Sequence, residues 1–263
     1  MATNTPAVLY RGNPQYGATS VVRTVTTAAL TSNLVTLTFG SNHGISQVGT
    51  IVNVMGVGAA YDGIFPIHSV PGLNQVTYVV TNANIASASV TPNGSAILNT
   101  GVTIGGSISN VAIVNYTALV STSAAHGLAI GDVVVVNSGN TGINGTWVVT
   151  SVPSASIFTF TSTTQTLAST AITQGAFAKA PAVYTVPSST TTIATNITVA
   201  NPSTNNVSVN ITMDGIAVAK QLTVSGNTTA FFDIKQVLAT TKTITVLSSI
   251  PQVDVMISGM TVV

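Results

Sequence analysis

Apolar residues alternate with hydroxyl residues along much of the chain. Threonines separate Val35, Leu37 and Phe39, and residues 207–213 repeat the pattern with valine, isoleucine and methionine. A period of two places successive side chains on opposite faces of a β-strand, so these stretches predict half-buried strands. An apolar stripe with the 3.6-residue period of a helix does not persist for three turns anywhere in the sequence. The pattern predicts an all-β protein with very little helix.

Two segments of the sequence repeat one another. Residues 49–78 match residues 131–160 at a constant offset of 82, without a gap. The matched positions include glycines, a Ser-Val-Pro triplet and aromatic residues, and a His-Gly dipeptide precedes each copy. Each copy is long enough to form a small domain. The repeat therefore predicts two tandem β-modules, over residues 22–106 and 107–181.

Turn residues indicate where the strands of each module begin and end. Asp62-Gly63 and Asn144-Gly145 can take positive φ at both central positions of a tight hairpin turn. Val-Pro at 70–71 and at 152–153 is expected to close a strand, because proline cannot donate a hydrogen bond to the ladder. Each module should then hold roughly five or six strands, as a small barrel or sandwich.

Residues 182–263 do not match the repeat, but they alternate in the same way. Turn residues such as Asp214-Gly215 separate the strand-like runs, and residues 235–238 are expected to form a single helical turn. Roughly seven strands over this length predict a β-sandwich of a jelly-roll-like kind.

Charge is scarce in this sequence. Only 4% of the residues are charged, glutamate is absent, and the formal net charge is +1. Such a chain has no field that would attract nucleic acid or anionic lipid, so we expect neither as a partner. The 45% of hydrophobic residues distinguishes it from a disordered chain. A folded surface with so little charge favours association, and a weakly charged monomer is the alternative.

Targeting and redox features are few. The chain has no cysteine, which excludes disulfides and thiolate metal sites. Its N-terminal residues lack the basic and apolar regions of a signal peptide. No apolar run reaches the roughly 20 residues of a membrane-spanning helix. We therefore expect synthesis in a host cytoplasm, without a membrane.

The second module contains three distinctive sequence phrases. They are His-Gly-Leu-Ala-Ile-Gly-Asp-Val-Val-Val-Val at 126–136, Asn-Gly-Thr-Trp-Val-Val-Thr-Ser-Val-Pro at 144–153 and Phe-Thr-Phe at 158–160. On these phrases the module resembles a unit that recurs in virion proteins of tailed bacteriophages. The first module is a weaker match, with Ser46-Gln47-Val48 in place of a shorter loop. The resemblance implies a component of a virus particle.

The C-terminal segment has distinctive phrases of its own. They include Tyr-Thr-Val-Pro at 184–187, Met-Asp-Gly at 213–215 and the stretch 233–238. On these residues the segment is similar to another structural domain of phage particles. In that family a Leu-Tyr-Arg-Gly strand commonly precedes the Val-Pro segment, whereas here this tetrapeptide lies far upstream, at residues 9–12. The resemblance implies that residues 1–21 supply a strand to the domain at 182–263, with both modules inserted between them.

Few residues could carry chemistry. His43 and His126 occupy equivalent places, where each could hold a metal or cap a turn through a backbone hydrogen bond, and no second ligand at metal spacing supports the former. A hydrolase of cell-wall or capsule polymers would need a carboxylate pair, but Asp62 and Asp132 fall at different points of the repeat. We predict no catalytic residue, no cofactor, no metal and no enzymatic activity.

Two groups of residues are candidates for binding. Tyr61 has no counterpart in the second module, and we expect it at an exposed hairpin tip, where it could contact a glycan together with Asp62. Charged and apolar residues near strand ends are candidates for subunit contacts, where charge pairs fix the register. These interface candidates are Leu9, Tyr10, Arg11, Phe231, Asp233 and Lys235.

These features predict a structural component of a bacteriophage virion. We expect a capsid decoration (cement) protein or a protruding fibre-like protein, whose C-terminal domain docks while the modules project. Its partners would be its own copies, expected as a trimer because many protruding virion proteins are three-fold, and other virion proteins such as the major capsid protein. The alternative is a tail or neck protein, or an adhesin, that recognises glycans of the host surface.

Overall fold

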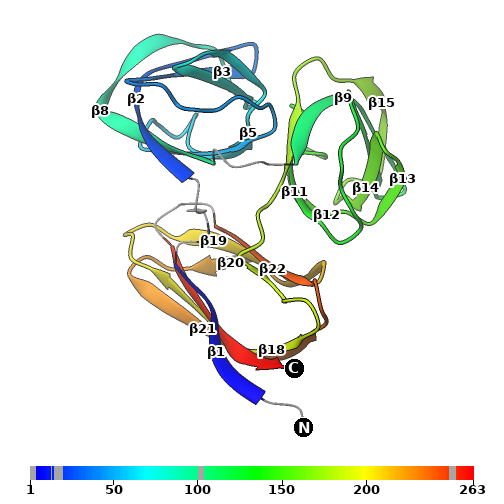
Figure 1. Cartoon of the computed structure of the whole chain (residues 1–263). Coiled ribbons are helices and arrows are strands. Elements are labelled where there is room, and N and C mark those ends of the chain that lie inside the picture. Colours follow the sequence, from blue (N-terminus) through cyan, green and yellow to red (C-terminus); the bar gives the residue numbers. More distant parts are fainter. Residues whose placement is uncertain (1–3, 13, 15–19, 100–103, 249–252) are drawn as a thin grey trace. The chain divides into compact units, whose positions relative to one another are not determined.

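The computed structural model describes residues 4–12, 14, 20–99, 104–248 and 253–263. Every regular element among these residues is a β-strand, which confirms the predicted all-β class (Figure 1). The described part of the chain contains no helix with the length and hydropathy needed to cross a bilayer. The chain divides into two compact units, one of Met1–Gly17 with Pro181–Val263 and the other of Ala18–Ala180.

The unit formed by Ala18–Ala180 holds both copies of the repeat, and each copy forms a curled sheet around its own core. In the first copy the strand order is β5-β4-β8-β2-β3-β7-β6. The strands are β2 (Ser20–Thr31), β3 (Leu34–Phe39), β4 (Ile51–Met55), β5 (Gly63–Pro66), β6 (Ser69–Gly72), β7 (Gln75–Val79) and β8 (Ile85–Asn99).

The second copy has the corresponding order β12-β11-β16-β9-β10-β14-β13, and β15 also pairs with β9. The long strand β8 of the first copy thus corresponds to two strands of the second. The strands are β9 (Gly105–Val114), β10 (Thr117–Thr122), β11 (Val133–Asn137), β12 (Gly145–Val148), β13 (Ser151–Ser154), β14 (Ile157–Thr161), β15 (Leu167–Ala171) and β16 (Ala176–Lys179).

The described residues therefore form seven strands in the first module and eight in the second, more than the five or six expected. The Ser-Val-Pro triplets account for part of the difference. They were expected to end strands, but they lie within β6 and β13, the last strands in the order of their sheets. A proline is tolerated there because an edge strand has one side without ladder partners.

The other unit is a sandwich of two four-stranded sheets, ordered β1-β23-β18-β21 and β17-β22-β19-β20. Its strands are β1 (Asn4–Gly12), β17 (Tyr184–Thr185), β18 (Thr191–Asn201), β19 (Val207–Met213), β20 (Ile216–Val224), β21 (Thr228–Leu238), β22 (Thr243–Ser248) and β23 (Asp254–Val262).

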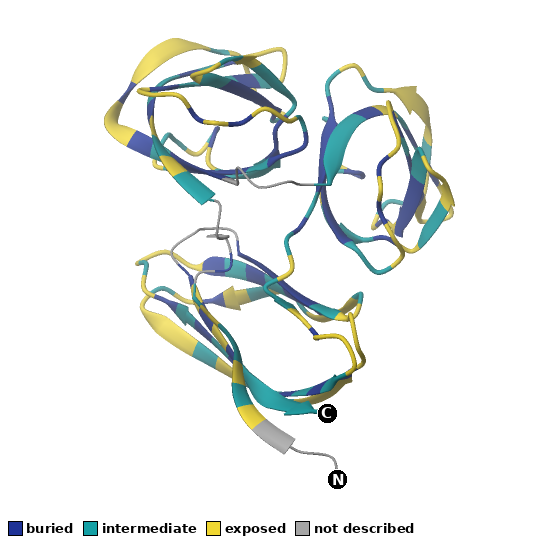
Figure 2. Ribbon diagram, viewed as in Figure 1, coloured by how far each residue is buried: buried dark blue, intermediate teal, exposed yellow. Residues whose placement is uncertain are grey.

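The helical turn expected at residues 235–238 is wrong, because these residues continue strand β21. Gln236, Val237 and Leu238 pair in register with residues 192–194 of β18. This pairing uses their backbone groups in a ladder and keeps the chain extended. Figure 2 shows buried residues along the inside of each sheet and a largely exposed β21, which is the last strand of its sheet.

Candidate interaction surface

The sheet β1-β23-β18-β21 turns one face toward the core of its unit. Ile257 pairs with Tyr10 on one side and with Ile197 on the other, and Ile197 pairs with Phe232. Both isoleucines are fully buried, and Tyr10 and Phe232 pack against the same core cluster. This row of four residues therefore marks the inner face of the sheet.

Side chains alternate along a strand, so the rows next to this one point outward. Two outward rows flank the Ile257 row, and a third follows beyond the next inner row. All three cross the four strands, and we refer to their residues together as the outer face. The rows are Arg11–Met256–Thr198–Phe231, Val8–Ser258–Asn196–Asp233 and Pro6–Met260–Ile193–Val237.

The outer face is rich in exposed apolar side chains. Phe231 is 70% exposed, Val8 60% and Val237 59%. Four of the exposed large apolar side chains among the described residues lie on the outer face: Val8, Phe231, Val237 and Met256. Three others belong to the same unit but not to this face, since Ile216 and Val218 lie on β20 of the other sheet and Val263 follows β23. Those of the two modules lie on separate strands and loops: Val22, Leu73, Val114, Tyr116 and Ile130. An apolar surface gathered on one face is typical of a protein–protein contact, whereas scattered residues are ordinary.

A shallow hollow lies at one end of the outer face. Its volume is about 340 Å³, and it is lined by Arg11, Gly12, Thr198, Ala200, Asp254, Val255 and Met256. Arg11 and Asp254 bring opposite charges to the hollow. Burial, and to a smaller extent the Asp254 carboxylate, raise the pKa of Tyr10 above its usual value. A hollow this open, with few converging polar groups, is better suited to a side chain of a partner protein than to an enclosed small molecule.

Two opposite charges lie on the outward side of β21. Asp233 and Lys235 are both exposed, and neither forms an ion pair with the residues that the structure describes. The Asn196 side chain on β18 donates a hydrogen bond to Asp233, with Nδ2 and Oδ1 3.1 Å apart. The Asp233 carboxylate is therefore held in place, while its charge remains available to a partner.

The structure places the six predicted interface residues in one sheet, but on two faces. Arg11 and Phe231 lie in the same outward row at opposite edges of the sheet, about 14 Å apart at the usual strand spacing. In contrast, Leu9 and Tyr10 are half-buried against the core of their own unit. A contact role for these two residues stays a prediction.

The exposed position predicted for Tyr61 is wrong. Its side chain is only 8% exposed and packs in the core of the first module, and its carbonyl accepts a 2.7 Å hydrogen bond from the Tyr78 hydroxyl. The ring is buried because it gains more from apolar contact than from solvent at this position. Asp62 is exposed, but its carboxylate accepts hydrogen bonds from the amides of residues 56–58 at 3.0–3.2 Å. The pair therefore does not form an exposed aromatic–carboxylate site for a glycan.

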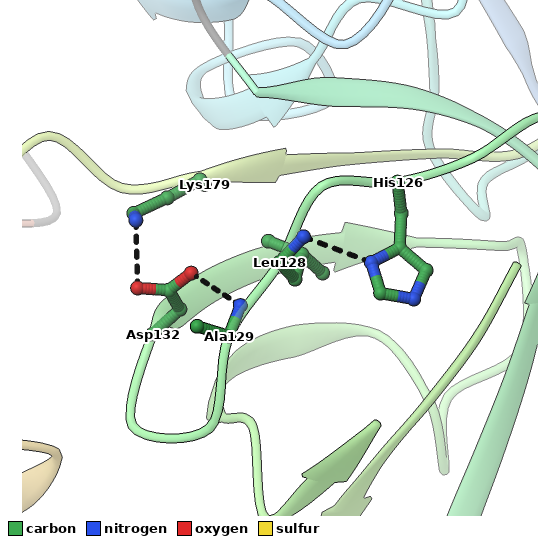
Figure 3. Close-up of polar contacts among 5 residues, drawn as sticks. All are labelled: His126, Leu128, Ala129, Asp132 and Lys179. Carbon is green, nitrogen blue, oxygen red and sulfur yellow. Dashed lines mark hydrogen bonds and ion pairs between the residues drawn. The ribbon is translucent and has the colours of Figure 1, made fainter. Parts of the chain in front are cut away.

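The equivalent histidines each organise a loop. The buried ring of His126 accepts a hydrogen bond at Nδ1 from the Leu128 amide, at 2.9 Å, as Figure 3 shows. Its Nε2 lies 3.2 Å from the Ser154 carbonyl oxygen. His43 repeats the arrangement with the Ile45 amide at 2.9 Å. These backbone contacts are the turn-capping role considered from the sequence.

Asp132 is also engaged locally. Its carboxylate accepts a 2.9 Å hydrogen bond from the Ala129 amide and lies 2.7 Å from the Lys179 ammonium (Figure 3). The carboxylates of Asp62 and Asp132 thus hold loops in separate modules. Within the described ranges, no three histidine or acidic side chains gather where they could hold a metal ion.

Sequence reasoning found Phe231 but missed the other apolar members of the outer face. Met256 and Ile193 lie in its central strands, and they were not among the interface candidates. A signal for Met256 was present, because it alternates with Val255 and Ile257, which are both buried. An apolar residue at an outward position of a regular strand indicates a surface that is covered by something else.

No family model matches the chain, and no curated protein matches it. Among solved structures, the endosialidase of phage phi92 is 15% identical over 68% of this chain and 30% of its own, with a TM-score of 0.26. The T13 IBDV viral particle protein is 10% identical over 93% and 70%, with a TM-score of 0.23. The major capsid protein P2 of bacteriophage PM2 is 9% identical over 99% and 97%, with a TM-score of 0.18.

The chain spans less than a third of the endosialidase that it matches. TM-scores of this size do not indicate a shared fold, so these likenesses assign neither a fold nor an activity to the chain.

Proposed function

We propose that this chain is a non-enzymatic structural component of a bacteriophage virion that binds its neighbours through the outer face. The observation that carries the proposal is the gathering of exposed apolar side chains, with unpaired charges beside them, on one face of a sandwich. The sequence resemblance to phage virion proteins supplies the context. A surface with few charged residues elsewhere is consistent with a protein that functions within an assembly.

The proposed contact is favourable for a simple reason. Covering apolar surface contributes roughly 25 cal/mol per Å², and permanent interfaces usually exceed about 2,000 Å². Phe231, Val237 and Val8 offer large side chains that contribute to this energy, because they are exposed in the isolated chain. Arg11 and Asp233 would then select the partner by charge, which fixes orientation more than it adds affinity.

Within this proposal we favour a capsid decoration protein or a protruding fibre-like protein. The unit that contains β1 and β17–β23 would dock, and the two modules would be presented to solvent. The modules suit this role because their exposed apolar side chains are dispersed. The glycan-binding alternative was based on an exposed Tyr61 beside Asp62, and Tyr61 is buried.

The proposal is tested by co-sedimentation of purified protein with particles of the source phage that lack it. A Met256→Lys variant places a charge on the outer face beside the hollow, in the inner strand β23, where the native side chain is 38% exposed. The matched control is Ile130→Lys, which makes the same kind of change at a 70% exposed position of the second module. We expect wild type and I130K to sediment with the particle, and M256K to remain in the supernatant with an unchanged circular dichroism spectrum.

Two results would contradict the proposal. Wild-type protein that never sediments with particles would remove the virion role. Equal binding by M256K and wild type would remove the outer face as the docking surface. Gold-labelled antibody on intact particles then distinguishes a position on the head from one on the tail.

A further inference from the structure

We infer that strand β21 pairs with β21 of a second copy of this chain, antiparallel and across a two-fold axis that passes beside Ile234. This inference deepens the proposed function by naming one partner of the docking unit, and it depends on that function for its biological setting. The open edge of β21, the order of side chains along it and the charges that it carries all favour this pairing.

The edge formed by β21 is open. Strand β21 ends the order β1-β23-β18-β21, and among the described residues it pairs with β18 alone. A strand at such an edge has one side without ladder partners, and this side can pair with another chain. Natural proteins usually protect such an edge with charge or proline. Here Thr228–Leu238 contains no proline, and its two charges have opposite signs.

The side chains of β21 are complementary to themselves. In an antiparallel pair with Ile234 opposite its own copy, Asp233 lies opposite Lys235 of the second copy, and Lys235 opposite its Asp233. The same register places the exposed Phe231 opposite Val237 of the second copy. Directly opposite side chains share one face of the sheet and are close enough to interact. Two ion pairs and two apolar pairs would therefore form at once.

The charges select this register over its neighbours. An axis beside Asp233 would oppose two aspartates, and an axis beside Lys235 would oppose two lysines. Like charges directly opposite each other are unfavourable, so both alternatives are disfavoured. The hydrogen bond from Asn196 holds Asp233 in its outward position before the partner arrives.

Side-chain pairs must dominate this contact. A register shift opposite residues 194–196 marks a bulge between Asp233 and Gln236, and a bulge shortens the ladder that can continue into a second chain. The two-fold arrangement gives a dimer. It replaces the trimer that was expected because many protruding virion proteins are three-fold. Isologous contacts of this kind close by themselves and do not form filaments.

Charge exchange tests the pairing by sedimentation equilibrium of the full-length chain. Asp233→Lys and Lys235→Asp each create two like charges on the edge, so each variant alone should dimerise at least tenfold more weakly than wild type. A one-to-one mixture of the two variants should recover dimers, because every lysine then faces an aspartate. The double variant D233K/K235D should recover them as well, with its charges exchanged. Thr161→Lys and Thr161→Asp, at an exposed position of the second module, are the matched controls and should behave as wild type.

Recovery in the mixture also separates this contact from a folding defect, since a misfolded variant would not regain dimers. The inference is overturned if wild type is monomeric at high concentration, if D233K alone dimerises as well as wild type, or if the mixture fails to recover. If the particle still binds wild type and not M256K, while the charge variants have no effect, only the two-fold pairing is wrong and the proposed function stands.

Discussion

The indole ring of Trp147 lies parallel to the ring of Phe160, with centroids 4.7 Å apart and planes inclined by 10°. The first module places Phe65 against Tyr78 in the same way, at 4.4 Å and 14°. These four residues occupy matched positions of the repeat. A parallel stack of two rings therefore recurs at the same position of each module. It joins β5 to β7 in the first module and β12 to β14 in the second.

Removal of this stack should destabilise the second module. We expect Trp147→Ala to lower the free energy of unfolding by about 3 kcal/mol, because a large, partly buried ring that packs against the core is lost. Trp147→Phe keeps a ring for stacking but loses the 2.8 Å hydrogen bond from Nε1 to the Ile143 carbonyl, which should cost about 1 kcal/mol. Urea unfolding followed by circular dichroism measures both values. Equal costs for the two variants would show that the stack contributes little.

Alkaline pH should destabilise the first module through Tyr78. Burial, and to smaller extents Asp62 and Tyr61, raise the pKa of Tyr78 well above its usual 10.0. The unfolded chain releases this proton near pH 10 while the folded chain keeps it. Stability from this residue is therefore complete below pH 10 and falls as the pH rises further. We expect the free energy of unfolding to decline as the pH rises above about 10, measured by urea titrations at each pH.

The Tyr78→Phe variant is the control for this pH dependence. It should lose most of the alkaline decline, because the titrating group is absent. At pH 7 it should be less stable than wild type by about 1–3 kcal/mol, since the Tyr61 carbonyl loses its 2.7 Å hydrogen bond in the core. An alkaline decline of unchanged steepness in Y78F would assign the effect to other tyrosines.

The two capping histidines should make contributions of similar size, each to its own module. Both rings accept a hydrogen bond from a backbone amide at Nδ1, and Nε2 contacts the Ser154 carbonyl in the second module and the Gly72 and Gln75 carbonyls in the first. His126→Ala and His43→Ala should each cost about 2–3 kcal/mol. The chain has one tryptophan, Trp147, so its fluorescence reports the second module. Both modules belong to one compact unit and are joined by contacts such as the hydrogen bond from the Asn137 side chain to the Val79 carbonyl. We therefore expect H126A to lower the urea midpoint seen by fluorescence more than H43A does. A fluorescence midpoint that shifts equally in both variants would contradict separate unfolding of the modules.

The sequence predicted the fold class because alternation and burial agree along most strands. The turns show where this reasoning works and where it fails. Asp214-Gly215 forms the expected tight turn, with positive φ at both residues. Asp62-Gly63 does not, because Asp62 instead holds a longer loop together through backbone amides. Tight turns with two positive φ values occur at Ser32-Asn33 and Asn115-Tyr116, which lack the glycine that would have revealed them.

The candidate surface was only partly visible from the sequence. Charged residues such as Arg11, Asp233 and Lys235 stood out because charge is rare in this chain. Which apolar residues face outward depends on register and on bulges, such as the one between Ala194 and Asn196. A shift of one residue exchanges the two faces of a strand, so the outer face could be assembled only from the pairing of all four strands.

Neighbouring phenylalanines on β21 provide a test of which face is covered by the chain itself. Phe231 is 70% exposed on the outer face, whereas Phe232 packs against the core of its unit. In dilute solution, where the chain is monomeric, we expect Phe231→Ser to change the free energy of unfolding by less than about 0.5 kcal/mol, as exposed substitutions usually do. Phe232→Ser should cost about 3 kcal/mol, because it removes a ring from the core and introduces a hydroxyl there. Thermal and urea unfolding of both variants measure the difference. A large cost for Phe231→Ser would mean that another part of the chain covers the outer face, which would leave that face unable to bind a partner.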